Sequence, residues 1–388
     1  MKEYASYAQS LREQLHMYPE IGFDLPKTIA LVHGELDKLG IVHSDKWGKS
    51  SVVGYIGKKD APITIGLRAD MDALPIQEAI DSPIRSRHDG MMHACGHDVH
   101  TAILLATAKW LKDHEDQLRC RVKLLFTPAE EYITPGCKEL AENGVMDDVD
   151  FAITAHVDPE TDTDRIISCL GNTYANSIGF KCRFYGTPAH ASVPQMGHDA
   201  IMMAVQAIGA MQNMVYREID PSQLTIFNIG SFHAGNTNNI VCGYAELFGT
   251  VRAFEDSVTD HLTRRLEEIT ASVAAMNGGR GEFEIVKMLP HVVNDGRVVE
   301  QIRRTCDRVL GPGHYAQRAR RAEGEDFGFL SRKKPCGQFH IGIKPPEQAE
   351  ALPPLHSDHF QVDDRCFETG IKMFTGFVLD AMDGIEGM

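Results

Sequence analysis

The most constraining feature of this sequence is the segment His93–His100, which reads His-Ala-Cys-Gly-His-Asp-Val-His. Imidazole and thiol groups brought this close together cost stability unless something binds them, because they compete for few protons and few partners. Thiolate and imidazole are the ligands that zinc and its borderline-soft neighbours prefer. We therefore expect the chain to fold so that other segments complete a metal site around this one.

The size and charge of the chain limit what it can bind. With 388 residues it exceeds what one compact core usually supports, so two domains are expected. The net charge of -15 argues against a nucleic-acid or anionic-membrane partner, because both would be repelled. An anionic small substrate remains compatible with this charge if a locally positive pocket receives it.

Neither a leader peptide nor a membrane span is predicted. The N-terminal segment has no apolar stretch of the leader type, and no run approaches the roughly 18 apolar residues that cross a bilayer. The nine cysteines are scattered singly, without a paired spacing. That usage fits a reducing compartment, so we expect a cytoplasmic protein.

Three predicted strands lead into polar side chains. The strands are expected at residues 63–67, 121–126 and 151–155, and the polar groups that follow them are Asp70 with Asp72, Glu130 with Glu131, and His156. In open α/β sheets, ligands bind outside the carboxyl ends of the strands. The two aspartates could equally cap a turn, and the two glutamates could form an exposed acidic loop.

The pattern of apolar and polar residues changes near residue 175. Apolar and polar residues alternate from Ile178 to Phe184, as in a half-buried antiparallel strand. The elements that follow give the order β-α-β-β-α-β, which is the ferredoxin-like arrangement. We therefore predict an α/β fold of two domains: residues 1–174 and 289–388 form the metal-binding domain, and residues 175–288 form an inserted ferredoxin-like α+β domain.

Five potential ligands come from four separate segments, each at a loop where strand ends should gather. They are Cys95, His97, Glu131, His156 and His356. Five ligands are too many for one tetrahedral zinc ion, but they suit two metal ions that share a water molecule. Side chains of neighbouring residues diverge, so one glutamate of the pair can bind metal while the other acts as general base.

Several motifs give the chain a family resemblance. They lie at His16–Glu20, Arg68–Pro75, His93–His100, Pro128–Glu131, Gly186–Ser192, Gly249–Arg252, Glu325–Phe327 and Leu355–Ser357. Together they resemble the aminoacylase-type dinuclear metallopeptidases. The most similar branch is the amidohydrolases that include hippurate hydrolase, indoleacetyl-amino-acid hydrolase and N-acetyl-diaminopimelate deacetylase. The resemblance covers nearly the whole chain in the same order.

The resemblance implies a fold and a set of roles. It implies a zinc-peptidase-like catalytic domain whose inserted domain serves as lid and dimerisation surface. The same five ligands fall on its metal-binding positions, and Glu130 falls on its catalytic base. His190 matches a histidine that reaches the scissile carbonyl, often across a dimer interface, and Asn239 and Arg252 match residues that hold the substrate carboxylate.

Other polar residues around the cluster are expected to support the ligands. Asp72, Asp98 and His100 are interpreted as groups that orient the metal ligands. His93 is assigned the same role.

The sequence departs from the family pattern at two places. Asn239-Ile240-Val241-Cys242 stands where relatives have Asn-Val-Ile-Pro, so the turn after Asn239 is expected to differ. Tyr132-Ile133-Thr134-Pro135 stands where relatives have glycines. These bulkier residues beside the base are expected to reshape the pocket for the acyl group.

The combined hypothesis is a metal-dependent amidohydrolase that cleaves the amide bond of N-acyl amino acids. Two divalent ions per subunit are expected, with Zn²⁺ preferred and Mn²⁺, Co²⁺ or Ni²⁺ as alternatives. The chain is expected to form a homodimer through its inserted domain. Three alternatives stay open: a dipeptidase or carboxypeptidase with the same centre, a metal-free hydrolase with Cys95 as nucleophile, and a non-catalytic metal-binding protein.

Overall fold

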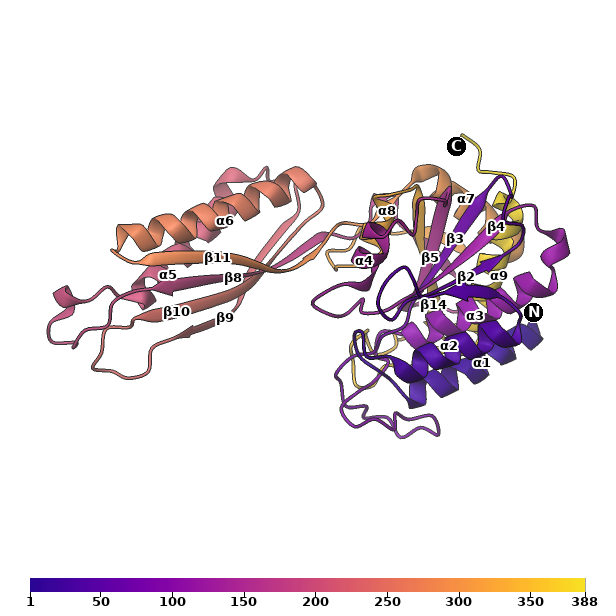
Figure 1. Cartoon of the computed structure of the whole chain (residues 1–388), viewed down its shortest axis with the longest axis horizontal. Coiled ribbons are helices and arrows are strands. Elements are labelled where there is room, and N and C mark those ends of the chain that lie inside the picture. Colours follow the sequence, from indigo (N-terminus) through magenta and orange to yellow (C-terminus); the bar gives the residue numbers. More distant parts are fainter. Residues whose placement is uncertain (388) are drawn as a thin grey trace. The chain divides into compact units, whose positions relative to one another are not determined.

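The computed structural model describes residues 1–387, which divide into two compact units. The larger unit contains residues 1–171, residues 292–320 and the chain from Asp326 onward, and the smaller contains residues 172–291 and 321–325. In Figure 1 the larger unit accordingly combines the indigo and purple start of the chain with its yellow end. Every helix among the described residues is too short or too polar to cross a lipid bilayer.

The larger unit is built on an eight-stranded sheet with the order β1-β2-β4-β3-β5-β14-β6-β13. Its strands are β1 (Val42–Ser44), β2 (Val52–Ile56), β3 (Thr64–Asp70), β4 (Arg121–Thr127), β5 (Phe151–Asp162), β6 (Ile166–Ser168), β13 (Tyr315–Gln317) and β14 (Cys336–Lys344). The four central strands β4, β3, β5 and β14 run parallel to one another. Every residue of β3 and β14 is buried, as expected for strands covered on both faces.

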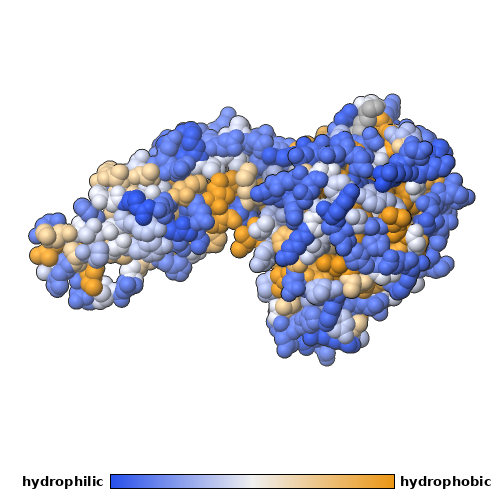
Figure 2. Space-filling model, viewed as in Figure 1, coloured by the Kyte–Doolittle hydropathy of each residue, from blue (hydrophilic) through white to orange (hydrophobic). Residues whose placement is uncertain are grey.

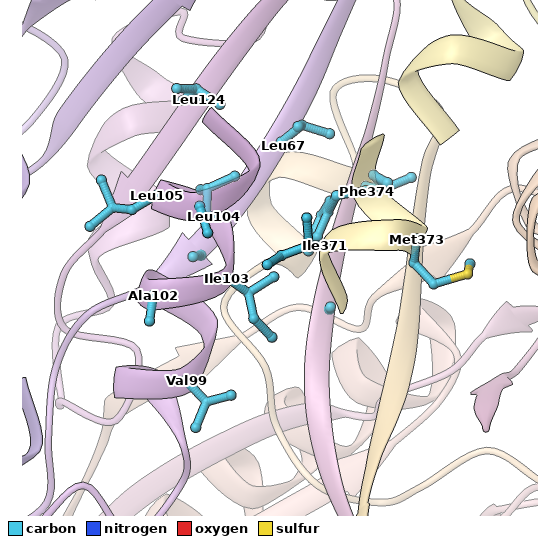
Figure 3. Close-up of a cluster of buried hydrophobic side chains, with 14 of the residues drawn as sticks. Leu67, Val99, Ala102, Ile103, Leu104, Leu105, Leu124, Ile371, Met373 and Phe374 are labelled. Carbon is cyan, nitrogen blue, oxygen red and sulfur yellow. The ribbon is translucent and has the colours of Figure 1, made fainter. Parts of the chain in front are cut away.

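Helices cover this sheet, and α3 is the most deeply buried of them. The helices are α1 (Lys2–Met17), α2 (Pro26–Lys38), α3 (His97–Asp113), η1 (Glu115–Gln117), α4 (Gly136–Glu142), α7 (Gly296–Val309), α8 (Gly328–Ser331) and α9 (Cys366–Ala381). Figure 3 shows Ile103 of α3 facing Ile371 of α9 within the apolar core. Because α3 begins at His97, this packing fixes the end of the His93–His100 segment.

The register of the central strands aligns their polar ends. Asp70 pairs with Thr127 across β3 and β4, and His156 pairs with His340 across β5 and β14. The pairing of β3 with β5 stops at Arg68 and Thr154. Strand β5 runs to Asp162 rather than ending before His156, so His156 lies inside the strand, at the level where its neighbour β3 ends.

The smaller unit is a four-stranded antiparallel sheet with the order β11-β8-β10-β9. Its elements are β8 (Asn176–Tyr185), η2 (Pro194–Met196), α5 (Ala200–Glu218), β9 (Thr225–Ala234), β10 (Tyr244–Ala253), α6 (Asp256–Met276) and β11 (Arg280–Leu289). Helices α5 and α6 lie on one face of the sheet (Figure 1). The short strands β7 (Gly171–Asn172) and β12 (Val293–Asn294) form a separate two-stranded sheet. This confirms the predicted α/β fold class with a separate β-α-β-β-α-β unit.

Candidate active site

Cys95 and His97 flank Gly96, a position where any other residue would strain the backbone. Gly96 has a φ of 80°, and a Cβ atom there would lie 2.5 Å from Cγ2 of Val157. This left-handed residue turns the chain into α3 without a side chain of its own. Cys95 is buried, and its Sγ atom lies 3.4 Å from Nε2 of His156.

His97 presents a buried nitrogen atom that has no hydrogen-bond partner. Its Nδ1 atom lies 2.8 Å from the carbonyl oxygen of Asp72, which can only accept, so Nδ1 carries the proton and donates it. Nε2 makes no hydrogen bond, and the Oδ2 atom of Asp70 is 3.8 Å away. An unpaired buried nitrogen costs free energy, and a bound metal ion would remove that cost.

His156 is held in the form that binds metal. Its Nδ1 atom donates to the carbonyl oxygen of Val157 at 2.8 Å, which leaves Nε2 directed at Cys95. Burial, followed by the neighbouring His100, lowers the pKa of His156 to about 3. The imidazole is therefore neutral at physiological pH, with the lone pair of Nε2 available.

Glu131 and His356 approach the same cysteine from two distant segments. Nε2 of His356 lies 2.8 Å from Oε1 of Glu131. The backbone N–H of His356 donates to the carbonyl oxygen of Ala94 at 2.8 Å, which attaches this loop to the cluster segment.

All five predicted ligands therefore come together in two overlapping groups. In each group the potential ligand atoms lie within 4.8 Å of one another: Cys95, His97 and His156 form one, and Cys95, Glu131 and His356 form the other. Cys95 belongs to both groups. A thiolate shared between two groups of nitrogen and oxygen donors fits two divalent ions.

The backbone is strained at two positions of this site. Among the described residues, only Ser50, Ala129 and His356 are non-glycine residues with positive φ. Ala129, with φ of 58°, directly precedes the two glutamates, and His356, with φ of 64°, is a potential ligand itself. Strain of this kind persists where the surrounding structure requires it, and it concentrates at functional sites.

Asp72 connects the glutamates to the histidine cluster. Its carboxylate accepts the backbone N–H groups of Glu130 and Glu131 at 3.0 and 3.1 Å, and its carbonyl oxygen accepts from His97. Glu130 is buried beside Glu131. Asp72 therefore contacts both the glutamate loop and the predicted ligand His97.

His100 is adjacent to the ligands, but both of its ring nitrogen atoms are engaged. Nδ1 lies 2.6 Å from Oδ1 of Asp70, and Nε2 accepts the backbone N–H of Val157 at 3.0 Å. His100 can therefore orient the site, although it has no lone pair left for a metal ion. The nearby Asp70, His97 and His100 do not form a further metal site for the same reason.

Asp98 turns away from the potential ligands toward helix α1. Its Oδ2 atom accepts from Nε of Arg12 at 3.0 Å and lies 2.7 Å from Nδ1 of His16. Burial opposes a charge on His16, but the carboxylates of Asp98 and Glu78 outweigh it and raise its pKa. The contacts of Asp98 thus fasten the first turn of α3 to α1, and they support His97 only through the backbone.

Arg68, for which no role was predicted, joins both sides of the site. Its guanidinium donates to Oδ2 of Asp70 at 2.8 Å and to Oδ1 of Asp326 at 2.6 Å. Oδ2 of Asp326 accepts the backbone N–H of Cys137 at 2.9 Å, after the glutamate loop. An arginine directly after the predicted apolar strand at residues 63–67 was the signal that could have identified it.

His190 and Asn239 lie on neighbouring exposed segments of the smaller unit. The backbone N–H of Ala191 donates to the carbonyl oxygen of Asn239 at 3.0 Å. The backbone N–H of Ser192 donates to Nδ1 of His190 at 3.1 Å, so the proton of the neutral ring is on Nε2. His190 can therefore donate a hydrogen bond from its exposed side.

Arg252 lies at the opposite end of strand β10 from these two residues. Tyr244 begins the strand next to the segment that carries His190, and the eight-residue step to Arg252 spans roughly 27 Å. Nη1 of Arg252 donates to the carbonyl oxygen of Ala322 at 3.0 Å. Within one chain, the structure does not bring Arg252 to His190 or Asn239.

Comparisons with known proteins agree with the cluster of donors. Residues 66–380 match the sequence model of Peptidase family M20/M25/M40. The chain belongs to this family. A solved structure described as a dinuclear metal-binding peptidase of the M20 family from Bacillus subtilis has a TM-score of 0.82 and 27% identity, covering 98% of both chains.

Curated M20 relatives are similar over most of their length. IAA-amino acid hydrolase ILR1-like 4 of Arabidopsis thaliana is 31% identical over 96% of this chain and 84% of its own. N-acyl-L-amino acid amidohydrolase of Geobacillus stearothermophilus is 32% identical over 86% and 93%, respectively. The family prediction is confirmed, and the chain is a metal-dependent hydrolase of amide bonds.

Proposed function

We propose that this M20 enzyme removes the acyl group from N-acyl amino acids. The observation that carries the proposal is the pair of donor groups sharing Cys95, with the unpaired Nε2 of His97, next to the buried Glu130. The names of two relatives, an IAA-amino acid hydrolase and an N-acyl-L-amino acid amidohydrolase, support this substrate class.

Two divalent ions would occupy the two donor groups. His97 and His156 would hold one ion, Glu131 and His356 the other, and the Cys95 thiolate would contact both. When bound, the ions would polarise the substrate carbonyl and make a nearby water molecule more acidic. The mixture of thiolate and imidazole favours Zn²⁺, while the carboxylate keeps Mn²⁺, Co²⁺ and Ni²⁺ as alternatives.

Glu130 would act as the general base and then as the general acid. Asp72 holds the backbone of both glutamates, so the two neighbouring side chains can diverge, with Glu131 at the donor cluster and Glu130 toward the attacking water. Glu130 would take a proton from the attacking water and return it to the leaving amine. The amide C–N bond breaks, and a carboxylate and a free amine are released.

The smaller unit would supply the groups that hold the substrate. The Nε2–H group of His190 suits a developing oxyanion, and Asn239 and Arg252 would bind the α-carboxylate. Since these residues lie at opposite ends of β10, one small substrate would need them from two copies of the chain. We therefore include in the proposal a homodimer formed through the smaller unit, which would also act as lid.

A metal-free cysteine mechanism receives no support from the surroundings of Cys95. Burial, followed by the Glu131 carboxylate, raises the pKa of the Cys95 thiol well above its usual range. A nucleophilic cysteine needs a lowered pKa, which cationic neighbours provide. Bound divalent ions would deprotonate this thiol, so its position suits a ligand rather than an isolated nucleophile.

The proposal places the enzyme in the cytoplasm. All nine cysteines are free and buried. Their chemistry suits a reducing compartment.

The decisive experiment combines metal analysis with a substrate panel. The protein purified and reconstituted with Zn²⁺ should hold about two equivalents per chain, lose activity to a chelator and regain it with metal. Well under two equivalents after reconstitution would contradict the dinuclear site. Acetyl, benzoyl and indoleacetyl amino acids should be hydrolysed, whereas cleavage of unblocked dipeptides alone would favour a dipeptidase.

A further inference from the structure

The loop after the two glutamates carries an unusual pair of exposed apolar side chains. Tyr132 and Ile133 are 47% and 63% exposed. Among the described residues of the larger unit, only Met1, Val42 and Leu170 are comparable large apolar residues with exposed side chains, and none of these three is adjacent to another. On the face of this unit that Figure 2 shows, apolar side chains gather in a few patches among largely hydrophilic ones.

This loop is fastened at both ends. At its start the carboxylate of Asp72 accepts the backbone N–H groups of Glu130 and Glu131. At its end the carboxylate of Asp326 accepts the backbone N–H of Cys137, and Arg68 holds Asp326 in place. The exposed tip with Tyr132 and Ile133 therefore belongs to a loop whose two ends are held by hydrogen bonds.

Tyr132 is also supported from the side. Gly22 has a φ of 62°, and a Cβ atom there would lie only 3.0 Å from Cδ2 of Tyr132. The aromatic ring therefore packs closely against a backbone that has no side chain, and about half of its surface stays exposed. A ring held in this way offers apolar surface at a low cost in conformational entropy.

We propose that Tyr132 and Ile133 form the wall that selects a bulky apolar acyl group. The inference rests on the proposed deacylation. Consecutive Cα atoms are about 3.8 Å apart, so the tip begins one residue from the potential ligand Glu131. The acyl group is bonded to the carbonyl carbon that would react at the donor groups, so it would extend past the residues next to Glu131. Covering this apolar pair would remove it from water.

The test compares two substrates that differ only in their acyl group. We expect wild type to hydrolyse N-benzoyl-L-alanine with a higher kcat/KM than N-acetyl-L-alanine. The double variant Tyr132→Ser/Ile133→Ser should lower kcat/KM for the benzoyl substrate roughly tenfold to a hundredfold, with the acetyl value within about threefold. Tyr132→Phe should keep the preference, and Leu170→Ser is the matched exposed control that should change neither value.

The outcomes separate this inference from the proposed function. If both substrates lose activity equally, the loop acts only by positioning the glutamates, and the inference is overturned. If neither value changes, including in the single variant Ile133→Ser, the tip does not contact the acyl group. Both results leave the proposed deacylation intact. Failure of metal-loaded wild type to hydrolyse either substrate would overturn the proposed function and the inference together.

Discussion

The two units present their functional side chains in opposite ways. In the larger unit, His97 and His156 are buried, and a hydrogen bond from Nδ1 fixes each ring. In the smaller unit, His190 and Asn239 are exposed on surface segments. The first arrangement fixes the rings of two proposed metal ligands before anything binds, whereas the second leaves two proposed substrate-binding side chains accessible to solvent.

This difference predicts which property of the protein a substitution changes. Changes that disturb the buried network should alter metal affinity or stability, because its members hold one another. Changes on the exposed segments should alter turnover alone, since little else depends on those side chains. Each of the following predictions tests that division.

The largest effect is expected at the proposed base. Glu130→Gln should lower kcat about a thousandfold, because the amide cannot accept the proton of the attacking water. Its metal content should stay at the wild-type level, as determined by elemental analysis. Glu142→Gln, an exposed glutamate on α4, is the matched control and should leave kcat unchanged. Wild-type turnover by Glu130→Gln would move the base elsewhere.

A smaller effect is expected in the exposed region. His190→Ala should lower kcat about a hundredfold through the lost oxyanion donor, with metal content and the unfolding midpoint unchanged. Coexpression with Arg252→Ala under two affinity tags allows mixed dimers to be purified. Each mixed dimer would contain one intact composite site, so about half of wild-type activity should return. Inactive mixed dimers would contradict the shared site.

Asp72 tests how firmly the buried network holds the metal. Asp72→Asn replaces one acceptor by an N–H donor facing the backbone of the glutamates, so metal affinity should fall roughly tenfold to a hundredfold. Competition with a metal indicator measures the change, and excess metal should restore turnover. Asp89→Asn, at an exposed aspartate, is the control. Unchanged metal affinity would show that the glutamate loop keeps its conformation without the Asp72 carboxylate.

The smallest effect is expected in the pH dependence of stability. Because the pKa of His16 is raised in the fold, its charged form stabilises the protein below the ordinary value of about 6.5. That contribution disappears as the pH rises through the raised pKa. In metal-free protein, His16→Gln should therefore cost about 1 kcal/mol more at pH 6 than at pH 9 in urea unfolding. Equal costs at both values would contradict a charged His16, and His359→Gln is the exposed control.

Much of the fold and of the site was predictable from local pattern. The alternation of apolar residues in β8 and the order of elements in the smaller unit identified its topology. The polar residues that follow β3 and β4 identified the edge of the sheet at which they meet. These features were accessible because a residue's periodicity and its neighbours in sequence decide them.

His97 was predicted as a ligand and His100 as a supporting residue, but the cause of that difference was visible only in the structure. His97 and His100 have the same chemistry, and both lie in the first turn of α3. His97 keeps a free Nε2 because Asp72 binds only its Nδ1, whereas Asp70 and Val157 engage both nitrogen atoms of His100. Asp98 likewise could not be assigned without its partners on α1.

Motifs and patterns along the chain were enough to assign the family and the α/β architecture and to predict the candidate donor residues. Only the tertiary structure decided that Cys95 belongs to two donor groups, and that β10 separates Arg252 from His190. A histidine nitrogen keeps its lone pair for a metal ion only where no nearby N–H or O–H group donates to it. Those partners come from strands and loops that are distant in sequence.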